Sequence, residues 1–388
     1  MRLVFSTDKL VVGGRAFVGF PILLDNEMRA IVPAQDWLWE VLASAKRSSP
    51  MTWQAYGRAM YDFFAYVLTN QVDWKSPPQP GYPSAIESYR DWSKNKVGLD
   101  ASTINSRLRT ITRFYSWAKK KGHVQYLPGE YETVRTSRQP GFLAHVDTTN
   151  GKVSTPAYML RQERKQIGFL TKEQVQVCRD TLTNITHRSM FELMVRTGLR
   201  SMECRSFPES YVFDPGRRKD LNPKQMIRVT LKAGEMQTKY GVERDIDVPY
   251  SLMEALWAYK VRHRQGRENN QRAGVVYPNL FLTEAGEPYP GSGLERVFEM
   301  LRKKVRFDVH PHRLRHTYAT YLLWSLRKSK TFDGEPLLYV RDRMGHSDIN
   351  TTTIYLHLIN SLEGHLVLAH EDEIDALFAT QKEEVNGS

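Results

Sequence analysis

The side chains best suited to chemistry lie in three short blocks of the C-terminal half of the chain. Residues 197–203 read Thr-Gly-Leu-Arg-Ser-Met-Glu, and residues 312–317 read His-Arg-Leu-Arg-His-Thr. In the third block, residues 344–355, His346 follows a glycine and Tyr355 comes nine residues later. Arginine carries a permanent charge on a planar fork that grips two phosphate oxygens. Imidazole moves protons near neutrality, and a phenol beside cations can become a nucleophile. Together these residue types suit chemistry at a phosphate group.

In residue type, order and spacing, the three blocks resemble the tyrosine recombinase (phage integrase) family of DNA strand-exchange enzymes. The resemblance covers the C-terminal half of the chain and, more loosely, a helical region before it. It implies that a tyrosine oxygen attacks a DNA phosphodiester and forms a 3′-phosphotyrosine, which keeps the energy of the cut bond for religation. It implies no cofactor, and the sequence contains neither a cluster with metal-ligand spacing nor a phosphate-cradling loop of the Walker type.

The resemblance assigns the nucleophile and the phosphate clamp. Tyr355 would be the nucleophile, and Arg200 and Arg315 would bind the non-bridging oxygens of the phosphate. The β-branched run 351–354 predicts a strand by propensity alone, whereas the family places this tyrosine on a short helix.

The histidines divide into two groups. His312 is expected to accept the tyrosine proton or to hydrogen-bond the phosphate, and His346 to bind a phosphate oxygen. His316, which follows Arg315 directly, is interpreted as a structural histidine, and the same interpretation is given to His310 and His357.

The last two candidates are a general acid for the leaving group and a carboxylate that orients the residues that bind the phosphate. Lys239 would be the general acid for the departing 5′-oxygen, and Lys232, on the other side of the same turn, is its competitor. Glu203 occupies the acidic position that the family uses to orient the histidine and the arginine; in an unrelated helix it would face solvent.

The charge balance suits a nucleic-acid partner. Lys and Arg number 55 against 43 Asp and Glu, a net charge of +12, and such a surplus favours binding to phosphates through counterion release. Basic side chains gather away from the apolar stripe of a helix predicted after Ser102, and again near 161–165; a solvated helix face and an exposed loop are the simpler interpretations. The candidate DNA-binding residues are Arg107, Arg109, Arg113, Lys119, Lys120, Arg161 and Arg164.

The fold class predicted from these patterns is multidomain. An α-helical core-DNA-binding domain (SAM-like) precedes a mixed α/β, mainly helical, catalytic domain of the tyrosine recombinase type with a small antiparallel sheet. Turn-rich sequence such as Pro140-Gly141 interrupts periodicity between them. The predicted parts are an N-terminal hairpin or extension (1–34), the helical domain (35–128), an interdomain linker (129–168), the catalytic domain (169–362) and a C-terminal tail helix (363–388).

Within the catalytic domain, elements are expected to position the three blocks. A helix should end at Thr197-Gly198, since glycine allows a left-handed turn. Alternating apolar residues predict a hairpin of 226–232 and 244–248, with Lys239 in its connection. A third extended piece is expected at 275–282, and helices at 294–301 and 315–328. The connection 329–336 is longer than the family usually has.

We therefore predict a site-specific DNA recombinase that integrates, excises or transposes a mobile element. Its partners would be double-stranded DNA, three further copies in a tetramer on two sites, and accessory DNA-bending or directionality factors. The tail helix would dock on a neighbour or on its own domain. The alternatives are a type IB topoisomerase-like DNA-relaxing enzyme and a non-catalytic DNA-binding regulator.

The expected location is the bacterial cytoplasm, at the nucleoid when DNA is bound. Two cysteines, Cys178 and Cys204, form no disulfide framework and are typical of a reducing compartment. No apolar run approaches the roughly 20 residues of a membrane span, so no membrane partner is expected.

Overall fold

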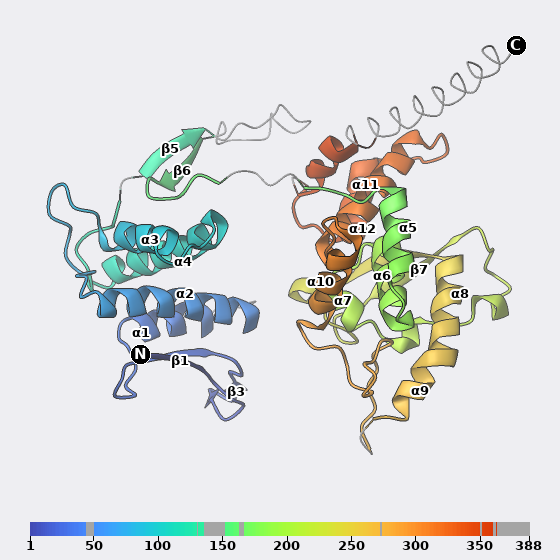
Figure 1. The fold of residues 1–388 in the computed structure, drawn as a ribbon, viewed down its shortest axis with the longest axis horizontal. Helices are drawn as coiled ribbons and strands as arrows, with labels where there is room; N and C mark the ends of the chain where they lie inside the picture. Colours follow the sequence, from blue (N-terminus) through green and yellow to red (C-terminus); the bar gives the residue numbers. More distant parts are fainter. Residues whose placement is uncertain are drawn as a thin grey trace, which may run out of the picture. The chain divides into compact units, whose positions relative to one another are not determined.

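The computed structural model describes residues 1–43, 50–129, 131–135, 152–162, 167–271, 274–349, 351–359 and 362. The chain divides into two compact units, Met1–Arg164 and Lys165–Ser388 (Figure 1). No helix within the described ranges is both long and apolar enough to cross a membrane. The predicted tail helix, 363–388, lies outside the described residues.

The first unit begins with four short strands. β1 (Arg2–Phe5) pairs antiparallel with β4 (Pro21–Leu24), and β2 (Val11–Val12) pairs with β3 (Arg15–Ala16) around Gly13-Gly14. The predicted N-terminal hairpin is therefore confirmed, but as two separate two-stranded sheets. Gly57 of the following helix lies so close to β4 that a Cβ there would collide with Pro21.

The next elements of this unit are helices, as predicted. They are α1 (Ala34–Leu38), which continues as a π-helical turn (Trp39–Ala43), α2 (Pro50–Thr69), α3 (Ala85–Asn95) and α4 (Ala101–Lys120). Ser84 and Glu87 form the capping box of α3. Asp100 caps α4, because its carboxylate accepts hydrogen bonds from the backbone N–H groups of Ser102 and Thr103. The core between these helices is strongly aromatic and includes Trp37, Phe63, Phe64, Trp74, Tyr89, Phe114 and Tyr115.

Part of the predicted linker is ordered within the first unit. β5 (Tyr131–Arg135) pairs antiparallel with β6 (Lys152–Pro156). Tyr158 is buried, its hydroxyl lies 2.6 Å from the hydroxyl of Thr112, and the Asn105 side chain bonds both the N–H and the C=O of Leu160. The segment just before the unit boundary therefore packs against α4.

In its described residues, the second unit is mainly helical with one hairpin (Figure 1). Its helices are α5 (Lys172–Thr181), α6 (Ile185–Thr197), α7 (Ser201–Arg205), α8 (Tyr250–Tyr259), a π-helical turn (Lys260–Arg264), α9 (Gln265–Glu268), α10 (Gly293–Val305), α11 (Pro311–Lys328) and α12 (Pro336–Met344). β7 (Met226–Leu231) and β8 (Arg244–Pro249) form the predicted hairpin, in which Met226 lies opposite Pro249 and Leu231 opposite Arg244. The expected extended piece at 275–282 is wrong as a strand, because this stretch makes only isolated bridges.

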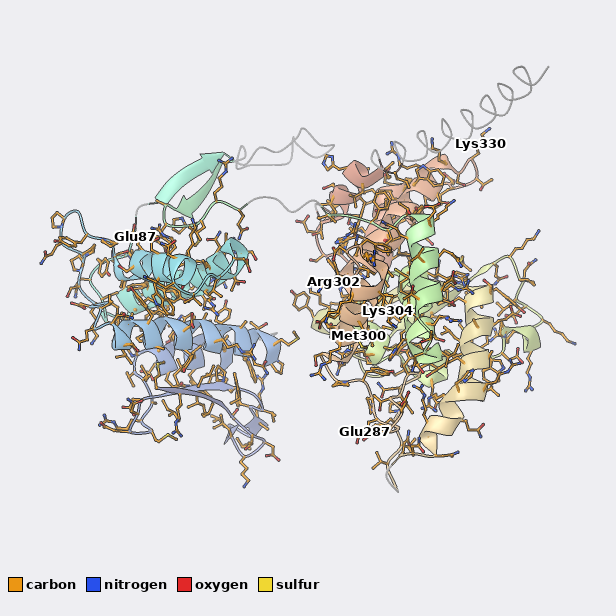
Figure 2. All side chains as sticks on the ribbon, viewed as in Figure 1. Glu87, Glu287, Met300, Arg302, Lys304 and Lys330 are labelled. Atoms are coloured by element: carbon orange, nitrogen blue, oxygen red, sulfur yellow. The ribbon has the colours of Figure 1, made fainter. Side chains whose placement is uncertain are left out.

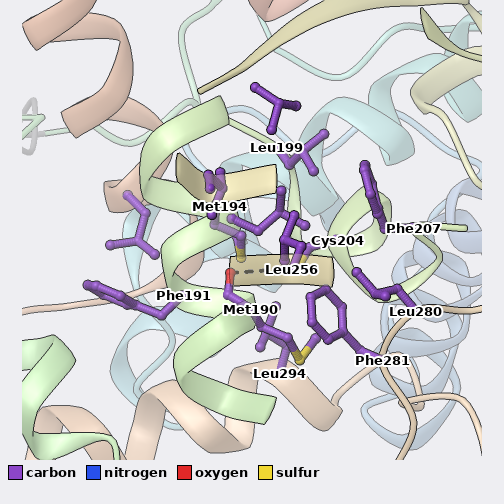
Figure 3. Packing of buried hydrophobic residues seen from close by; sticks show 14 of the residues in the cluster. Met190, Phe191, Met194, Leu199, Cys204, Phe207, Leu256, Leu280, Phe281 and Leu294 are labelled. Atoms are coloured by element: carbon purple, nitrogen blue, oxygen red, sulfur yellow. Dashed lines mark hydrogen bonds between the residues drawn. The ribbon is translucent and has the colours of Figure 1, made fainter. Parts of the chain in front are cut away.

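The large core of this unit fixes the elements beneath the blocks. Figure 3 shows Met190 and Met194 of α6 packed with Cys204 of α7 and Leu256 of α8, and the Cys204 Sγ lies 3.7 Å from the Met190 carbonyl oxygen. Burial raises the pKa of Cys178 to about 11, so both cysteines behave as small core residues.

A second, smaller core joins α11, α12 and a helical segment at 351–359. Its members are Tyr318, Ala319, Leu323, Leu337, Val340, Met344, Tyr355 and Ile359. On α10 the predicted apolar stripe is buried, while Arg302 and Lys304 (Figure 2) are exposed.

Candidate active site

Two glycine turns form the backbone of the site. Gly198 ends α6 with φ 68°, and a Cβ there would collide with Tyr318 of α11. Gly345 ends α12 with φ 59°, and a Cβ there would meet the Arg244 side chain. Both positions require left-handed backbone in a crowded place, which only glycine satisfies without strain. The turns leave their carbonyl oxygens free to accept hydrogen bonds from arginines.

Arg315 is enclosed by these turns. It lies inside α11 and is 1% exposed. Its guanidinium donates to the Gly198 carbonyl oxygen at 2.6 Å and to the Met344 carbonyl oxygen. Burial lowers the pKa of Arg315 to about 9, with Arg200 and Arg244 adding repulsion, so the group is still charged near neutrality but lacks a sufficient local anion. An arriving phosphate would supply one.

Glu203 holds two arginines in fixed orientations. It is 0% exposed, its Oε1 accepts from Arg200 at 3.0 Å, and its two oxygens accept from Arg244 at 2.6 and 2.7 Å. Burial would raise the pKa of Glu203, but the bonds and charges of Arg244 and Arg200 outweigh it and lower the pKa to about 2. Arg200 also donates to the Met344 and Gly345 carbonyl oxygens, each at 3.3 Å. The contact with Arg200 agrees with the orienting role expected of Glu203.

Tyr355 lies on the helical segment 351–359, so strand propensity in this run does not prevail. The side chain is 1% exposed and belongs to the smaller core. Burial raises the pKa of Tyr355 to about 12, although Arg315 and Arg200 act in the opposite direction. The hydroxyl is therefore protonated at rest, close to two cations that favour its ionised form.

The histidines differ in their contacts. His316, interpreted from the sequence as a structural histidine, is buried, and its Nδ1 lies 3.2 Å from the Tyr355 hydroxyl. The His312 ring lies beside His316, with centroids 4.3 Å apart, and His346 Nδ1 lies 2.9 Å from the Thr352 hydroxyl. The spacing along α11 could have indicated that His316 lies near the site, since residues 312 and 316 share one helix face.

Lys239 lies in a single 3-10 turn (Lys239–Gly241) within the β7–β8 connection. Its ammonium is 5.1 Å from the ring centroid of Tyr240, whose φ of 62° is unusual for a non-glycine residue. The competitor, Lys232, forms an exposed ion pair with Glu235 at 3.1 Å. Burial lowers the pKa of His312, and the charges of Arg315, Arg200 and Lys239 add to this effect.

Arg244 is the second residue that the sequence analysis missed. Besides Glu203 it contacts the Arg343 carbonyl oxygen through Nε at 3.1 Å, at the last turn of α12. Asp247, also on β8, accepts from Tyr339 at 2.6 Å and from Arg343 at 2.5 Å. The hairpin strand thus fixes the end of α12 from which the Gly345 turn departs. No pattern in the sequence pairs Arg244 with Glu203, which precedes it by 41 positions.

The candidate DNA-binding residues lie in different settings. Arg109, Arg113, Lys119 and Lys120 are exposed on α4, and Arg161 is exposed further along. Arg107 is the exception, since its guanidinium is bound to Asp62 and lies 3.4 Å from the Tyr89 hydroxyl within the first unit. Arg164 lies outside the described residues. In the described ranges, no three metal-ligating side chains come together.

Comparison with known proteins bears on this geometry. Residues 168–361, half of the chain, match the phage integrase family. Transposase A from transposon Tn554 of Staphylococcus aureus is 24% identical over 349 residues, covering 87% of this chain and 90% of that protein. Tyrosine recombinase XerC of Lacticaseibacillus casei is 23% identical over 323 residues, covering 82% and 92% respectively.

Solved structures share the fold. The Tn1549 transposon integrase in complex with a circular intermediate DNA superposes with a TM-score of 0.54 at 18% identity, over 83% of this chain and 94% of that one. A lambda integrase dimer bound to a core site gives 0.52 at 15% identity, over 84% and 94%.

Proposed function

Because this chain belongs to the phage integrase family, it is a tyrosine recombinase of the mobile-element type, and we propose that Tyr355 is the nucleophile with which it cleaves DNA. Site-specific recombination through DNA cleavage and religation is the activity of the family; relaxation by a type IB topoisomerase and regulation without catalysis are not favoured. The observation that carries the proposal is the position of the Tyr355 hydroxyl, buried close to Arg200 and Arg315 and bonded to a histidine.

The phosphate clamp follows from the two arginines. Arg200 and Arg315 would hold the non-bridging oxygens and stabilise the charge that grows on them in the pentavalent state. Both are already oriented, Arg200 by Glu203 and Arg315 by the carbonyl oxygens of the two glycine turns. Such preorganisation means that little rearrangement of these groups accompanies the reaction. His312 and His346 would complete the contacts to the phosphate.

The bond changes balance without an external reactant. The Tyr355 oxygen forms a bond to phosphorus as its O–H bond breaks and the phenol proton passes to a histidine of the site, and the bond from phosphorus to the 5′-oxygen breaks. Lys239 would give its proton to that oxygen. Religation runs the same steps in reverse, with the 5′-hydroxyl attacking the 3′-phosphotyrosine.

The partner we propose is duplex DNA bearing a specific recombination site. The exposed cations on α4 support this, and the similar Tn1549 and lambda integrases have been seen bound to DNA. We propose four protomers on two sites, in the bacterial cytoplasm at the nucleoid, with accessory DNA-bending or directionality factors as further partners.

The test uses a nicked duplex that carries the ends of the element in which the gene lies. Full-length protein is incubated with this DNA in EDTA, and a denaturing gel reports protein joined to the 3′ side of the cut. The expected result is an adduct with the wild-type protein and none with Tyr355→Phe. An adduct that persists in Tyr355→Phe, or none from wild-type protein on DNA that it binds, would overturn the assignment.

A further inference from the structure

We propose that His316 is a further catalytic residue, the group that accepts the Tyr355 proton as the tyrosine oxygen attacks. This inference rests on the proposed role of Tyr355 as nucleophile. The carrying contact is the 3.2 Å distance between His316 Nδ1 and the Tyr355 hydroxyl. Proton transfer requires hydrogen-bond contact, directly or through one water, and this pair has direct contact in an interior position where solvent does not compete.

The other two histidines near Tyr355 are less well placed. His346 directs Nδ1 to the Thr352 hydroxyl at 2.9 Å, and its ring is nearly parallel to that of Tyr355, with centroids 6.2 Å apart. The His312 ring packs edge-on against His316 at 4.3 Å. His312 and His346 are therefore available for phosphate oxygens, whereas His316 faces the nucleophile.

The surroundings of His316 keep its acceptor nitrogen free. Burial, followed by the effects of His312, Arg315, His310 and His346, lowers the pKa of His316 to about 3. The ring is neutral at physiological pH, and with its proton on Nε2 it accepts a hydrogen bond at Nδ1. At rest the proton stays on the phenol, because the pKa of Tyr355 is far higher.

Arrival of the phosphate changes this balance. Negative charge brought beside Arg315, the neighbour that is shared by His316 and Tyr355, offsets the repulsion that opposes an imidazolium there. The Tyr355 O–H bond then breaks with its proton passing to Nδ1, while the oxygen bonds to phosphorus. In religation the imidazolium of His316 returns the proton to the departing phenolate. Lys239 acts separately, at the 5′-oxygen.

The experiment distinguishes a role of His316 as the base from the role of Lys239 as the acid and from a purely structural role of His316. His316→Asn places an amide near the Nδ1 position that can accept a hydrogen bond but cannot take up a proton; His316→Gln is the second variant. The matched control is His357→Asn, a histidine substitution at an exposed position of the Tyr355 helix. Initial rates of adduct formation are measured at saturating DNA across about pH 6 to about pH 9, on the nicked duplex described above. A second substrate carries a 5′-bridging phosphorothiolate, whose sulfur leaves without an acid.

The expected wild-type rate is nearly constant with pH, and His357→Asn matches it. His316→Asn and His316→Gln should react about 100-fold more slowly near neutrality. Their rates should rise about tenfold per pH unit, because hydroxide must then remove the phenol proton. The phosphorothiolate should restore Lys239→Ala but neither His316 variant.

Three outcomes would overturn the proposal. The first is a wild-type rate in either His316 variant, the second is a slow rate that does not change with pH, and the third is recovery with the phosphorothiolate. If both variants lose the fold, the pH dependence of the wild-type rate decides, since a wild-type rate that rises about tenfold per pH unit also contradicts an internal base. Each of these results leaves the Tyr355→Phe test unaffected, so failure of His316 is distinguishable from failure of the nucleophile.

Discussion

The two units of the chain bury different kinds of side chain. In the described part of Met1–Arg164 the buried polar residues are neutral, namely Ser84, Ser93, Asn105 and Thr110, and the core is a network of aromatic rings. In Lys165–Ser388 the buried set includes Glu203, Asp247, Arg264, Arg315, Arg343 and His316. Buried charges add little to stability compared with well-packed apolar groups.

The difference indicates that the second unit is the one whose buried residues are chosen for chemistry as well as for packing. A scaffold that only presents a basic surface can be built on apolar packing, and α1 to α4 are built this way. A site that must stabilise charge on a phosphate needs cations held in a dry, fixed arrangement. The second unit accepts the desolvation cost of such cations and compensates them with Glu203 and with backbone carbonyl oxygens.

The largest effect is expected from a comparison of two buried arginines in the second unit. Arg315 and Arg264 are both 1% exposed, but Arg264 bonds Asn279 and Tyr277 carbonyl oxygens and acidic side chains outside the site. Arg315→Lys should reduce the rate of adduct formation by about 10²–10³-fold, since lysine cannot reproduce the planar fork. Arg264→Lys should lower stability and leave the rate per folded molecule unchanged. Equal rate losses in both would mean that burial alone, and not position, makes Arg315 important.

The next largest effect contrasts an acidic residue of each unit. Glu203→Gln leaves Arg200 and Arg244 without their carboxylate in a buried place, and we expect a loss of roughly 3–5 kcal/mol in local unfolding free energy. Asp62→Asn breaks a partly exposed pair with Arg107 and should cost about 1 kcal/mol. Hydrogen exchange of the full chain, followed in α7 and in α2, measures the two losses separately. Similar losses would contradict the contrast between the units.

Much of the fold follows from the sequence because its signals are local. The apolar stripe of α4, the αL glycine at 198 and the alternation of β7 and β8 each lie within a single element. The helix predicted after Ser102 begins at Ala101, because the Asp100 carboxylate caps it.

The less predictable parts of the site depend on tertiary contacts. The run 351–354 favours a strand locally, yet Thr352, Tyr355 and Ile359 are buried on one side of a helix, and their packing overrides propensity. Arg244 pairs with Glu203 across the interior, and His316, interpreted as a structural histidine, contacts the Tyr355 hydroxyl. In both cases the decisive information is which side chains face each other.

Lowering the pH should reduce the stability of the second unit more than that of the first, by a moderate amount. The folded-state pKa of His316 is lowered to about 3, so this ring gains a proton on unfolding at pH values between about 3 and its ordinary pKa near 6.5. Stability is therefore retained above about pH 6.5 and falls as pH decreases toward 3, by up to about 1.4 kcal/mol per pH unit for this group.

Exchange of α11 and α4 amides, corrected for intrinsic rates, should therefore show α11 losing protection between about pH 6.5 and about pH 5 while α4 does not. His316→Asn should flatten the response of α11. A response in α11 that survives this substitution unchanged would assign the acid sensitivity to other groups.

A smaller effect is expected at Arg244, which acts on the site through other residues. Arg244→Lys keeps the charge but loses one of the two bonds to Glu203 and the bond to the Arg343 carbonyl oxygen. We expect the maximal rate of adduct formation to fall about tenfold with little change in the DNA concentration for half-maximal rate, since a positioning defect affects the reaction more than binding. A change confined to the half-maximal concentration would instead indicate direct contact with DNA.

The smallest effects test the surface of the first unit, where Arg107 and Arg109 lie two positions apart on α4 in opposite settings. Arg107 is bound to Asp62, so Arg107→Ala should lower stability by about 1 kcal/mol and leave the salt dependence of DNA binding unchanged. Arg109 is exposed, and Arg109→Ala should leave stability unchanged while reducing the slope of log affinity against log salt by about 1, as expected for one lost phosphate contact. Binding titrations at several salt concentrations, paired with thermal unfolding, report both quantities. If Arg109→Ala leaves the slope unchanged, this face of α4 is a solvated surface and the DNA contacts of the first unit lie elsewhere.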